Sequence, residues 1–326
     1  MKRFFLSIFL IVGLLFVCPV LSFANDKQDQ ADALIARSRQ LSDIRASGSP
    51  AFHLKASVKL YSEKGQPTEG TYDEYWVSSA QWRREIVLGD FHRVEVAVGN
   101  KRWTTDSAEA PSYVMGPQKV LSVWEAGPEK WSVGRIYDKI SGINSFTCLE
   151  TKANLNGRKW SQCFEKTTGA MEAESMPLNL SNGVTPGVCE YTEPQTYMDK
   201  IFPSVVRCYV GDQSQLEMRI RLEHLANVPP DLFVHADSAK EGVNCQGPTT
   251  PPEPLGKNSI RLPGIGPPKA IPSLQITVDA DGIVRQVKVL RSGGKDVDNA
   301  FTDQVRNFRF KPANCDGQPV EAQITF

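Results

Sequence analysis

Cysteines are the residues of this sequence whose type and number point most directly to chemistry. The chain has 326 residues and seven cysteines, of which only Cys18 lies within the first 24 residues. The other six form an even set, which favours disulfide bonds if the chain is exported. A structural zinc site is disfavoured, because no C-x-x-C pair occurs and the four histidines are scattered. We therefore expect disulfides, and neither a metal nor another cofactor.

Hairpin patterns suggest partners for four of these cysteines. Cys148 and Cys163 lie on opposite arms of a hairpin around Leu155-Asn156-Gly157. Cys189 and Cys208 do the same around the next loop. Directly opposed residues on paired strands bring their Cβ atoms to about 4.5–5.5 Å, a spacing that suits a disulfide.

Two cysteines then remain. A bond between Cys245 and Cys315 would tie the segment before the C-terminal domain to that domain. The alternatives are that these residues pair otherwise or stay free.

The sequence carries no recognised catalytic motif. G-x-S-x-G, H-E-x-x-H, the P-loop and the dinucleotide-binding fingerprint are all missing. Asp73 and Glu74 are adjacent on an expected strand, so their side chains point to opposite faces. His92 lies beside Arg93 and Glu95, but a single histidine on a strand is more often structural. We expect that the protein is not an enzyme.

The first residues resemble an export signal. Lys2 and Arg3 precede an apolar run that Pro19 breaks, and Ser22-Phe23-Ala24 places small residues where a signal peptidase cleaves. We interpret residues 1–24 as a signal peptide and expect a periplasmic protein. The alternative is an uncleaved anchor in the inner membrane, because the run is nearly long enough to span a bilayer.

Composition is that of an ordinary globular protein with a formal net charge of zero. This balance gives no indication of a nucleic-acid partner. The length after removal of a signal favours two domains.

The larger region, residues 25–240, combines one helix with many short strands. Residues 26–45 place apolar side chains on one helical stripe. Alternating strands follow at 52–60, 71–77, 81–88, 92–98, 146–152, 158–165, 188–191, 204–210 and 216–222, with a short helix at 117–124. This order predicts a curved antiparallel sheet around the helix, or an open barrel.

Proline and glycine dominate the next segment. We interpret residues 241–258 as an extended linker and place the start of the second domain at residue 259.

The C-terminal region, residues 259–326, predicts a small layered unit. Strands are expected at 274–278 and 283–290, then a helix from about 296 to 308, a strand at 309–311 and a final extended segment at 320–326. This β-β-α-β order puts one helix on one face of an antiparallel sheet. The fold class of the whole chain is therefore α+β.

The C-terminal region resembles the C-terminal domain of TonB-family proteins. The motifs that carry the resemblance are 278–282 (VDADG), 287–293 (VKVLRSG), 297–300 (VDNA), 305–313 (VRNFRFKPA) and 316–320 (DGQPV). Phe308 stands where the family often has Trp, and the Pro-rich segment before the first strand replaces a helix.

This resemblance implies a way of binding partners. Family members add a strand of another envelope protein, such as the plug of an outer-membrane transporter, to the edge of their sheet. The expected partner strand of this chain is the last one, with Val320, Gln323, Ile324 and Phe326 as candidates.

The N-terminal region has a weaker resemblance to LolA/LolB-like periplasmic lipoprotein carriers. It rests on Tyr72 to Val77, Gln81 to Glu85 and Pro230 to Phe233. The resemblance implies an apolar cavity for an acyl lipid or a hydrophobic peptide. The candidate lining residues are Trp76, Trp82, Trp103 and Trp124; alternatively, these tryptophans fill the core.

Two functions therefore compete. One is a non-enzymatic periplasmic binding protein that engages another envelope protein by strand addition, possibly linked to transport. The other is a carrier of lipid or lipoprotein in the N-terminal cavity.

Overall fold

The computed structural model describes residues 26–61, 65–108, 116–122, 132–152, 159–180, 183–246, 249–256, 260 and 271–325. The expected signal peptide, Trp124 and Phe326 lie outside these residues, as does the predicted turn at 155–157. Within the described part of the chain, no helix combines the length and apolar character needed to cross a membrane.

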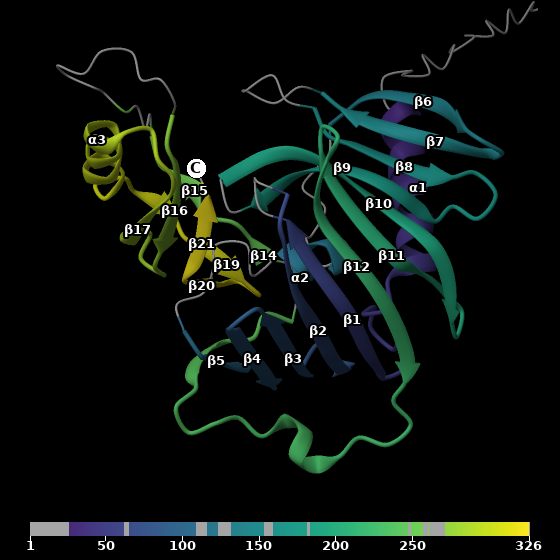
Figure 1. Cartoon of the computed structure of the whole chain (residues 1–326), viewed down its shortest axis with the longest axis horizontal. Coiled ribbons are helices and arrows are strands. Elements are labelled where there is room, and N and C mark those ends of the chain that lie inside the picture. Colours follow the sequence, from purple (N-terminus) through teal and green to yellow (C-terminus); the bar gives the residue numbers. More distant parts are fainter. Residues whose placement is uncertain are drawn as a thin grey trace, which may run out of the picture.

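A strongly curved antiparallel sheet forms most of the molecule (Figure 1). Its 13 strands have the order β13-β5-β4-β3-β2-β1-β12-β11-β10-β9-β8-β7-β6. Strands that are neighbours in the sheet are consecutive in the chain, except where β1 pairs with β12 and where β13 pairs with β5. The strands are β1 Phe52–Tyr61, β2 Pro67–Ser78, β3 Gln81–Leu88, β4 Phe91–Val98, β5 Lys101–Asp106, β6 Val133–Ser141, β7 Asn144–Thr151, β8 Ser161–Glu165, β9 Met171–Leu180, β10 Gly183–Tyr197, β11 Lys200–Val210, β12 Gln213–His224 and β13 Lys240–Val243.

Two helices cover the concave face of this sheet. Helix α1, Asp26–Ser42, contacts β6 and β11 and buries Ala31 completely. The short helix α2, Gly116–Leu121, packs on β9 through Val120 and Leu121. A one-turn 3-10 helix, η1 at Pro230–Phe233, connects β12 to β13. The prediction of a helix within a curved sheet is confirmed.

The core lies on the concave side, because alternate side chains of each strand point there. In β3 every second residue is buried, from Trp82 to Leu88. The ring of Phe52 stacks on Trp76 at 5.4 Å between centroids and meets Tyr197 edge-on at 6.3 Å. This aromatic packing fills the part of the sheet around β1 and β2.

The C-terminal unit, at the left of Figure 1, has its own small core. Its main sheet has the order β17-β16-β21, and helix α3 contacts β17. Phe301 and Phe308 pack against buried apolar residues that include Ile276 and Phe310. The elements are β14 Thr249–Thr250, β15 Glu253–Pro254, β16 Ser273–Val278, β17 Val284–Arg291, α3 Lys295–Val305, β18 Phe310–Lys311, β19 Ala313–Cys315, β20 Gln318–Val320 and β21 Ala322–Thr325.

Gly282 shows why the family motif has glycine in this turn. Its φ of 79° suits glycine, and a Cβ atom would stand 1.9 Å from the carbonyl oxygen of Phe310. Its own carbonyl accepts a hydrogen bond from the Phe310 amide at 2.9 Å.

The segment 241–258, expected as a linker, contributes strands at both of its described ends. Residues 241–243 belong to β13 in the large sheet, whereas β14 and β15 pair with β19 and β18 of the C-terminal unit. Prolines occur in this segment because very short edge strands tolerate a missing N–H donor.

Both hairpin disulfides that the sequence predicted are present, and the pair that the sequence left open, Cys245–Cys315, is bonded as well. Cys148–Cys163 and Cys189–Cys208 join directly opposed strand residues, with Cα atoms 4.1 Å and 4.0 Å apart. Cys245–Cys315 closes a separation of 70 residues and connects the end of the large sheet to β19. The disulfide part of the sequence interpretation is confirmed.

Candidate functional site: an open sheet edge and an apolar cavity

The last strand of the C-terminal unit is an edge strand. Among the described residues, β21 pairs with β16 alone, through a register that sets Ile324 opposite Ile276 and Gln323 opposite Thr277. Ile324 packs on the small core, while Gln323 is exposed. An edge strand leaves one row of backbone N–H and C=O groups available for another chain.

The structure separates the partner-strand candidates. Gln323 and Ile324 lie on β21, but Val320 ends β20 and pairs with Ala313 of β19. The sequence pattern suggested one extended segment, and the chain instead changes sheets at Glu321, between β20 and β21.

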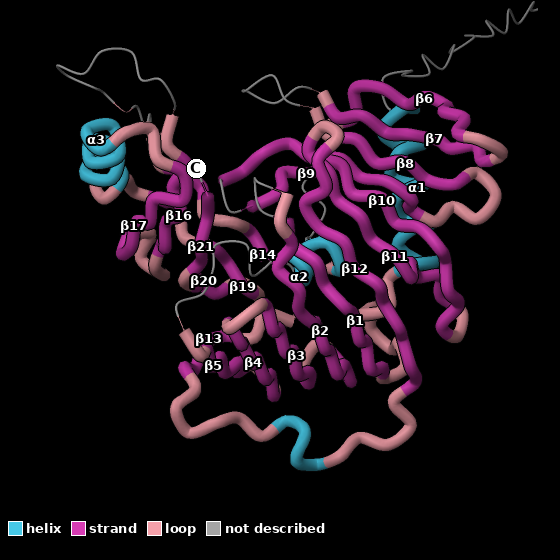
Figure 2. The backbone as a smooth tube through the Cα atoms, viewed as in Figure 1, coloured by secondary structure: helices cyan, strands magenta, loops and turns pink. Residues whose placement is uncertain are grey.

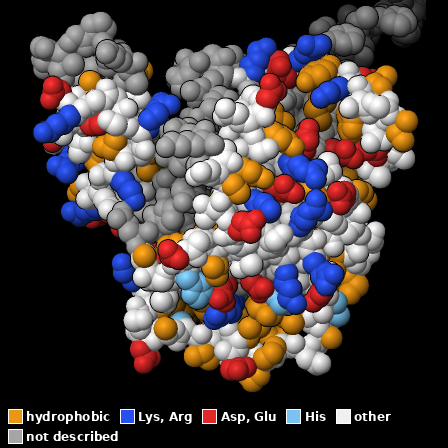
Figure 3. Space-filling view, in the orientation of Figure 1, with side chains coloured by type: hydrophobic (Ala, Val, Ile, Leu, Met, Phe, Trp, Pro, Cys, Tyr) orange, Lys and Arg blue, Asp and Glu red, His pale blue; other side chains and the backbone are white. Residues whose placement is uncertain are grey.

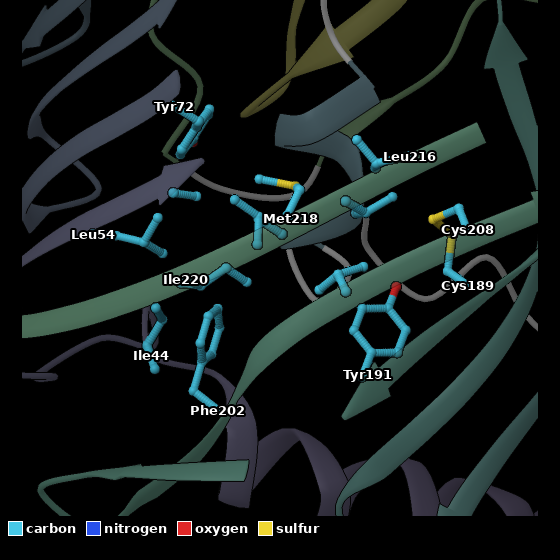
Figure 4. Packing of buried hydrophobic residues seen from close by; sticks show 14 of the residues in the cluster. Ile44, Leu54, Tyr72, Cys189, Tyr191, Phe202, Cys208, Leu216, Met218 and Ile220 are labelled. Carbon is cyan, nitrogen blue, oxygen red and sulfur yellow. A yellow bond between two sulfur atoms is a disulfide. The ribbon is translucent and has the colours of Figure 1, made fainter. Parts of the chain in front are cut away.

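A cavity of about 460 Å³ lies on the concave face of the large sheet. Its walls come from the loop after α1, from the end of α2 and from strands β9 to β11. The apolar lining residues are Ile44, Val120, Leu121, Ala170, Met171, Tyr191, Pro194, Ile201, Phe202 and Pro203. Figure 4 shows Ile44, Tyr191 and Phe202 within the surrounding core. A mainly apolar cavity of this size suits a small hydrophobic molecule.

The polar lining residues lie toward one end of the sheet. Asn144 is the first residue of β7, Glu165 is the last residue of β8, and Thr168 belongs to the β8–β9 turn. Desolvation by itself would raise the pKa of the Glu165 carboxyl, but the hydrogen bonds that Thr167 and Thr168 donate to it together outweigh this effect and hold the pKa at about 2. This rim therefore carries a fixed negative charge.

The tryptophan candidates have other positions. Trp76 and Trp82 are buried core residues, and Trp82 donates from Nε1 to Asn244 Oδ1 at 3.2 Å. Trp103 stacks on His235 at 4.3 Å between ring centroids. None of these three described tryptophans lines the cavity. Trp76 and Trp82 are buried in the core, as their size suggests, and Trp103 is half-buried. Which residues line the cavity depends on how the sheet curves.

One wall of the cavity is held by a buried ion-pair cluster. Glu74 is fully buried and accepts from Arg84 Nε at 3.0 Å, from Arg45 Nε at 3.1 Å and from Tyr72 Oη at 3.0 Å. Arg45 Nη1 also donates to the Leu121 carbonyl at 2.8 Å, which fixes the end of α2. Burial by itself would raise the pKa of Glu74, but the two guanidinium groups outweigh it and hold the pKa at about 2.

A second buried carboxyl lies behind another part of the wall. Glu174 of β9 accepts from Gln162 Nε2 at 3.0 Å, but its Oε2 atom has no hydrogen-bond donor. Burial raises the pKa of Glu174 to about 7, with the charge of Lys119 on α2 acting weakly in the opposite direction. The cavity-lining residue Tyr191 faces Glu174, and burial beside this carboxyl raises the tyrosine pKa. Sequence reasoning missed this pair, because a glutamate at an alternating strand position reads equally well as solvated surface.

Side chains that suggested catalysis are paired locally. His92 Nε2 lies 2.7 Å from Glu85 Oε1 on the strand beside it. Asp73 contacts His53 at 2.6 Å, on the face of the sheet opposite Glu74. Among the described residues, no group of three or more histidine, cysteine or acidic side chains is arranged to hold a metal ion.

Comparison with known proteins identifies the C-terminal unit. Residues 272–326 match the family model described as Gram-negative bacterial TonB protein C-terminal. The recognition of a TonB-like domain from its motifs is therefore confirmed. No curated protein sequence matches the chain.

Solved structures similar to the chain belong to the LolA group and to a family of unassigned function. A LolA superfamily protein from Nitrosomonas europaea is 7% identical and covers 63% of this chain and 97% of its own, with a TM-score of 0.40. A putative outer membrane lipoprotein-sorting protein domain from Vibrio parahaemolyticus is 10% identical, covering 63% and 95% at a TM-score of 0.39. A DUF1329 family protein from Desulfovibrio piger is 9% identical, covering 65% and 97% at a TM-score of 0.41. At these sequence identities and TM-scores, the similarity gives no information about a ligand or a partner of this chain.

Proposed function

We propose that this chain is a non-enzymatic binding protein of the periplasm, whose TonB-like domain engages another envelope protein by strand addition. The observation that supports the proposal most directly is the edge position of β21, which pairs on one side only among the described residues. Backbone hydrogen bonds would supply the affinity, and the exposed and half-buried side chains of β21 the selectivity.

The partner is expected to be an extended segment. Only a strand can satisfy the alternating donors and acceptors of an open edge. A segment from the periplasmic side of an outer-membrane transporter has this character, and such a partner would link the protein to transport.

Site-specific photocrosslinking tests this proposal in intact cells. A crosslinker at exposed Gln323 is expected to form an adduct with one envelope protein, whereas one at exposed Asn299 on α3 is not. Deleting residues 322–326 should abolish binding of the identified partner segment to the purified chain. Equal adducts from both positions, or binding that survives the deletion, would contradict strand addition.

The cavity supports a second candidate function, the carriage of an acyl lipid or hydrophobic peptide. Its apolar lining and volume of about 460 Å³ favour a chain-like apolar ligand. Native mass spectrometry of the mature protein is expected to show bound lipid. Ala170→Phe fills the cavity and should remove that lipid, while Ser214→Phe, at an exposed site outside the lining, should not.

A further inference from the structure

Two isoleucines at one hairpin tip have the most exposed side chains among the large apolar residues that the structure describes. Ile140 is 78% exposed and Ile143 is 101% exposed, the highest values for large apolar side chains in the described residues. Ser141 pairs with Asn144, so Gly142 and Ile143 form the two-residue turn between β6 and β7. Gly142 supplies the positive φ of 60° that such a turn needs. The turn itself therefore gives no reason for isoleucine.

A second apolar tip lies at the same end of the sheet. Because the strands of this meander alternate in direction, the β6–β7, β8–β9 and β10–β11 turns share one end, seen as loops along the right side of Figure 2. The β10–β11 turn presents Met198, which is 52% exposed. At the opposite end, the described β11–β12 turn, Gly211-Asp212, has no apolar side chain.

The cavity reaches this same end. Asn144, which follows Ile143, and Thr168 of the neighbouring turn both line it. Hydrogen bonds hold the neighbouring turns to α1: Arg37 Nη2 donates to the Thr168 carbonyl at 3.3 Å, and Lys200 Nζ to the Gln40 carbonyl at 2.7 Å. The tips are thus fixed around the mouth of the cavity.

We propose that this rim, formed by the tips of the β6–β7 and β10–β11 hairpins, docks on a lipid bilayer with Ile140 and Ile143 inserted into its interface. The apolar side chains stand on separate protruding turns, which suits a fluid surface better than a shaped protein groove. Exposed Lys139 adjoins the isoleucines and has access to anionic headgroups, whereas Lys166 on the next turn is paired with Asp138 at 2.7 Å. Figure 3 shows apolar and charged side chains interspersed over the visible face.

Vesicle flotation with the full-length mature, oxidised chain tests the proposal. The wild type is expected to float with vesicles of phosphatidylethanolamine containing about one quarter phosphatidylglycerol. Because Ile140→Ser with Ile143→Ser removes both inserted apolar side chains, it should lower partitioning by at least about tenfold. The matched control is Val234→Ser with Val243→Ser, at 65% and 46% exposed sites away from these hairpins, which should float like the wild type.

Each outcome decides the question. Failure of the wild type to float, or equal flotation of the isoleucine variant, overturns the proposal. Complete release by high salt would also overturn it, because that result indicates adsorption through lysines alone. Unchanged thermal unfolding of the serine variants shows that the effect is local. Ala170→Phe should float normally, so membrane docking is separable from ligand binding and from strand addition at β21.

Discussion

The two halves of the large sheet close their concave faces in different ways. Around β1 to β3 the face is filled by stacked aromatic rings and by the Glu74 cluster, with Phe52 and Trp76 in direct contact. Around β7 to β11 the face leaves a cavity, and two cross-strand disulfides join its strands. The comparison teaches that a hollow region needs covalent support where a filled one is stabilised by packing.

The same contrast appears in two buried glutamates. Glu74, in the filled half, is neutralised by two arginines and stays ionised. Glu174, beside the hollow half, has an unpaired oxygen and is close to half protonated near neutral pH. The fold stabilises the charged form of the first carboxyl and the neutral form of the second, so the two make stability depend on pH with opposite signs.

The largest expected loss of stability comes from a substitution in the filled half of the sheet. Glu74→Leu leaves Arg45 and Arg84 buried without their counter-charge, since each side chain is only 7% exposed. We expect unfolding free energy to fall by about 3–5 kcal/mol, measured by urea denaturation. Glu69→Leu removes an exposed ion pair with Lys59 and should lower stability much less, because solvent screens such a pair. Similar losses in both variants would remove the distinction between the two clusters.

The next effect concerns the disulfides of the hollow half. Replacing Cys189 and Cys208 with alanine opens a loop of 19 residues and should cost about 3 kcal/mol. Hydrogen exchange should accelerate in β9 to β11 and stay unchanged in β2 and β3. Uniform acceleration across both halves would show that the sheet unfolds as one unit.

The pH dependence of stability should distinguish the two glutamates. The folded-state pKa of Glu174 is raised to about 7 from the usual value of 4.5. The stability of the fold is therefore not reduced by Glu174 below about pH 4.5, where the carboxyl is protonated in both states. As pH rises toward 7, the free energy of unfolding falls by up to about 3 kcal/mol. Glu174→Gln should abolish this loss and be more stable than the wild type at pH 8.

Glu74 contributes with the opposite sign. Its folded pKa of about 2 is below the usual value of 4.5, so its stabilisation is present above about pH 4.5 and is lost as pH falls toward 2. Urea denaturation of the wild type and of Glu174→Gln from pH 3 to 8 measures both slopes. Parallel curves for the two proteins above pH 4.5 would contradict the assignment to Glu174.

The smallest effect compares two tyrosines of β10, of which Tyr197 packs against Phe52 of the filled half and Tyr191 lines the cavity. Tyr197 Oη donates to the Ala51 carbonyl at 2.8 Å, whereas Tyr191 Oη has no hydrogen-bond partner. Tyr197→Phe should cost about 1 kcal/mol, and Tyr191→Phe should change stability by less than that. Thermal unfolding at pH 6 measures both, and the reverse order would show that Tyr191 is the better satisfied hydroxyl.

Much of the fold could be read from local patterns. Strict alternation in residues 52–60 and 81–88 predicted strands that the structure contains, and opposed hairpin positions predicted the pairing of Cys148 with Cys163. Strands β5, β6 and β9 were not predicted, because their exposed or irregular sequences lack a clear apolar alternation.

The sequence by itself determined the strands with clear alternation, the two hairpin disulfides and the TonB-like unit, since each depends on residues close together or on a fixed order of motifs. Only the tertiary structure decided where the cavity lies, which glutamate has counter-charges, and that Ile143 stands at the cavity rim. These features depend on the curvature that brings α1, α2 and strands far apart in the chain against one concave face. No local pattern of side chains encodes that curvature, because it results from the summed twist of many strands.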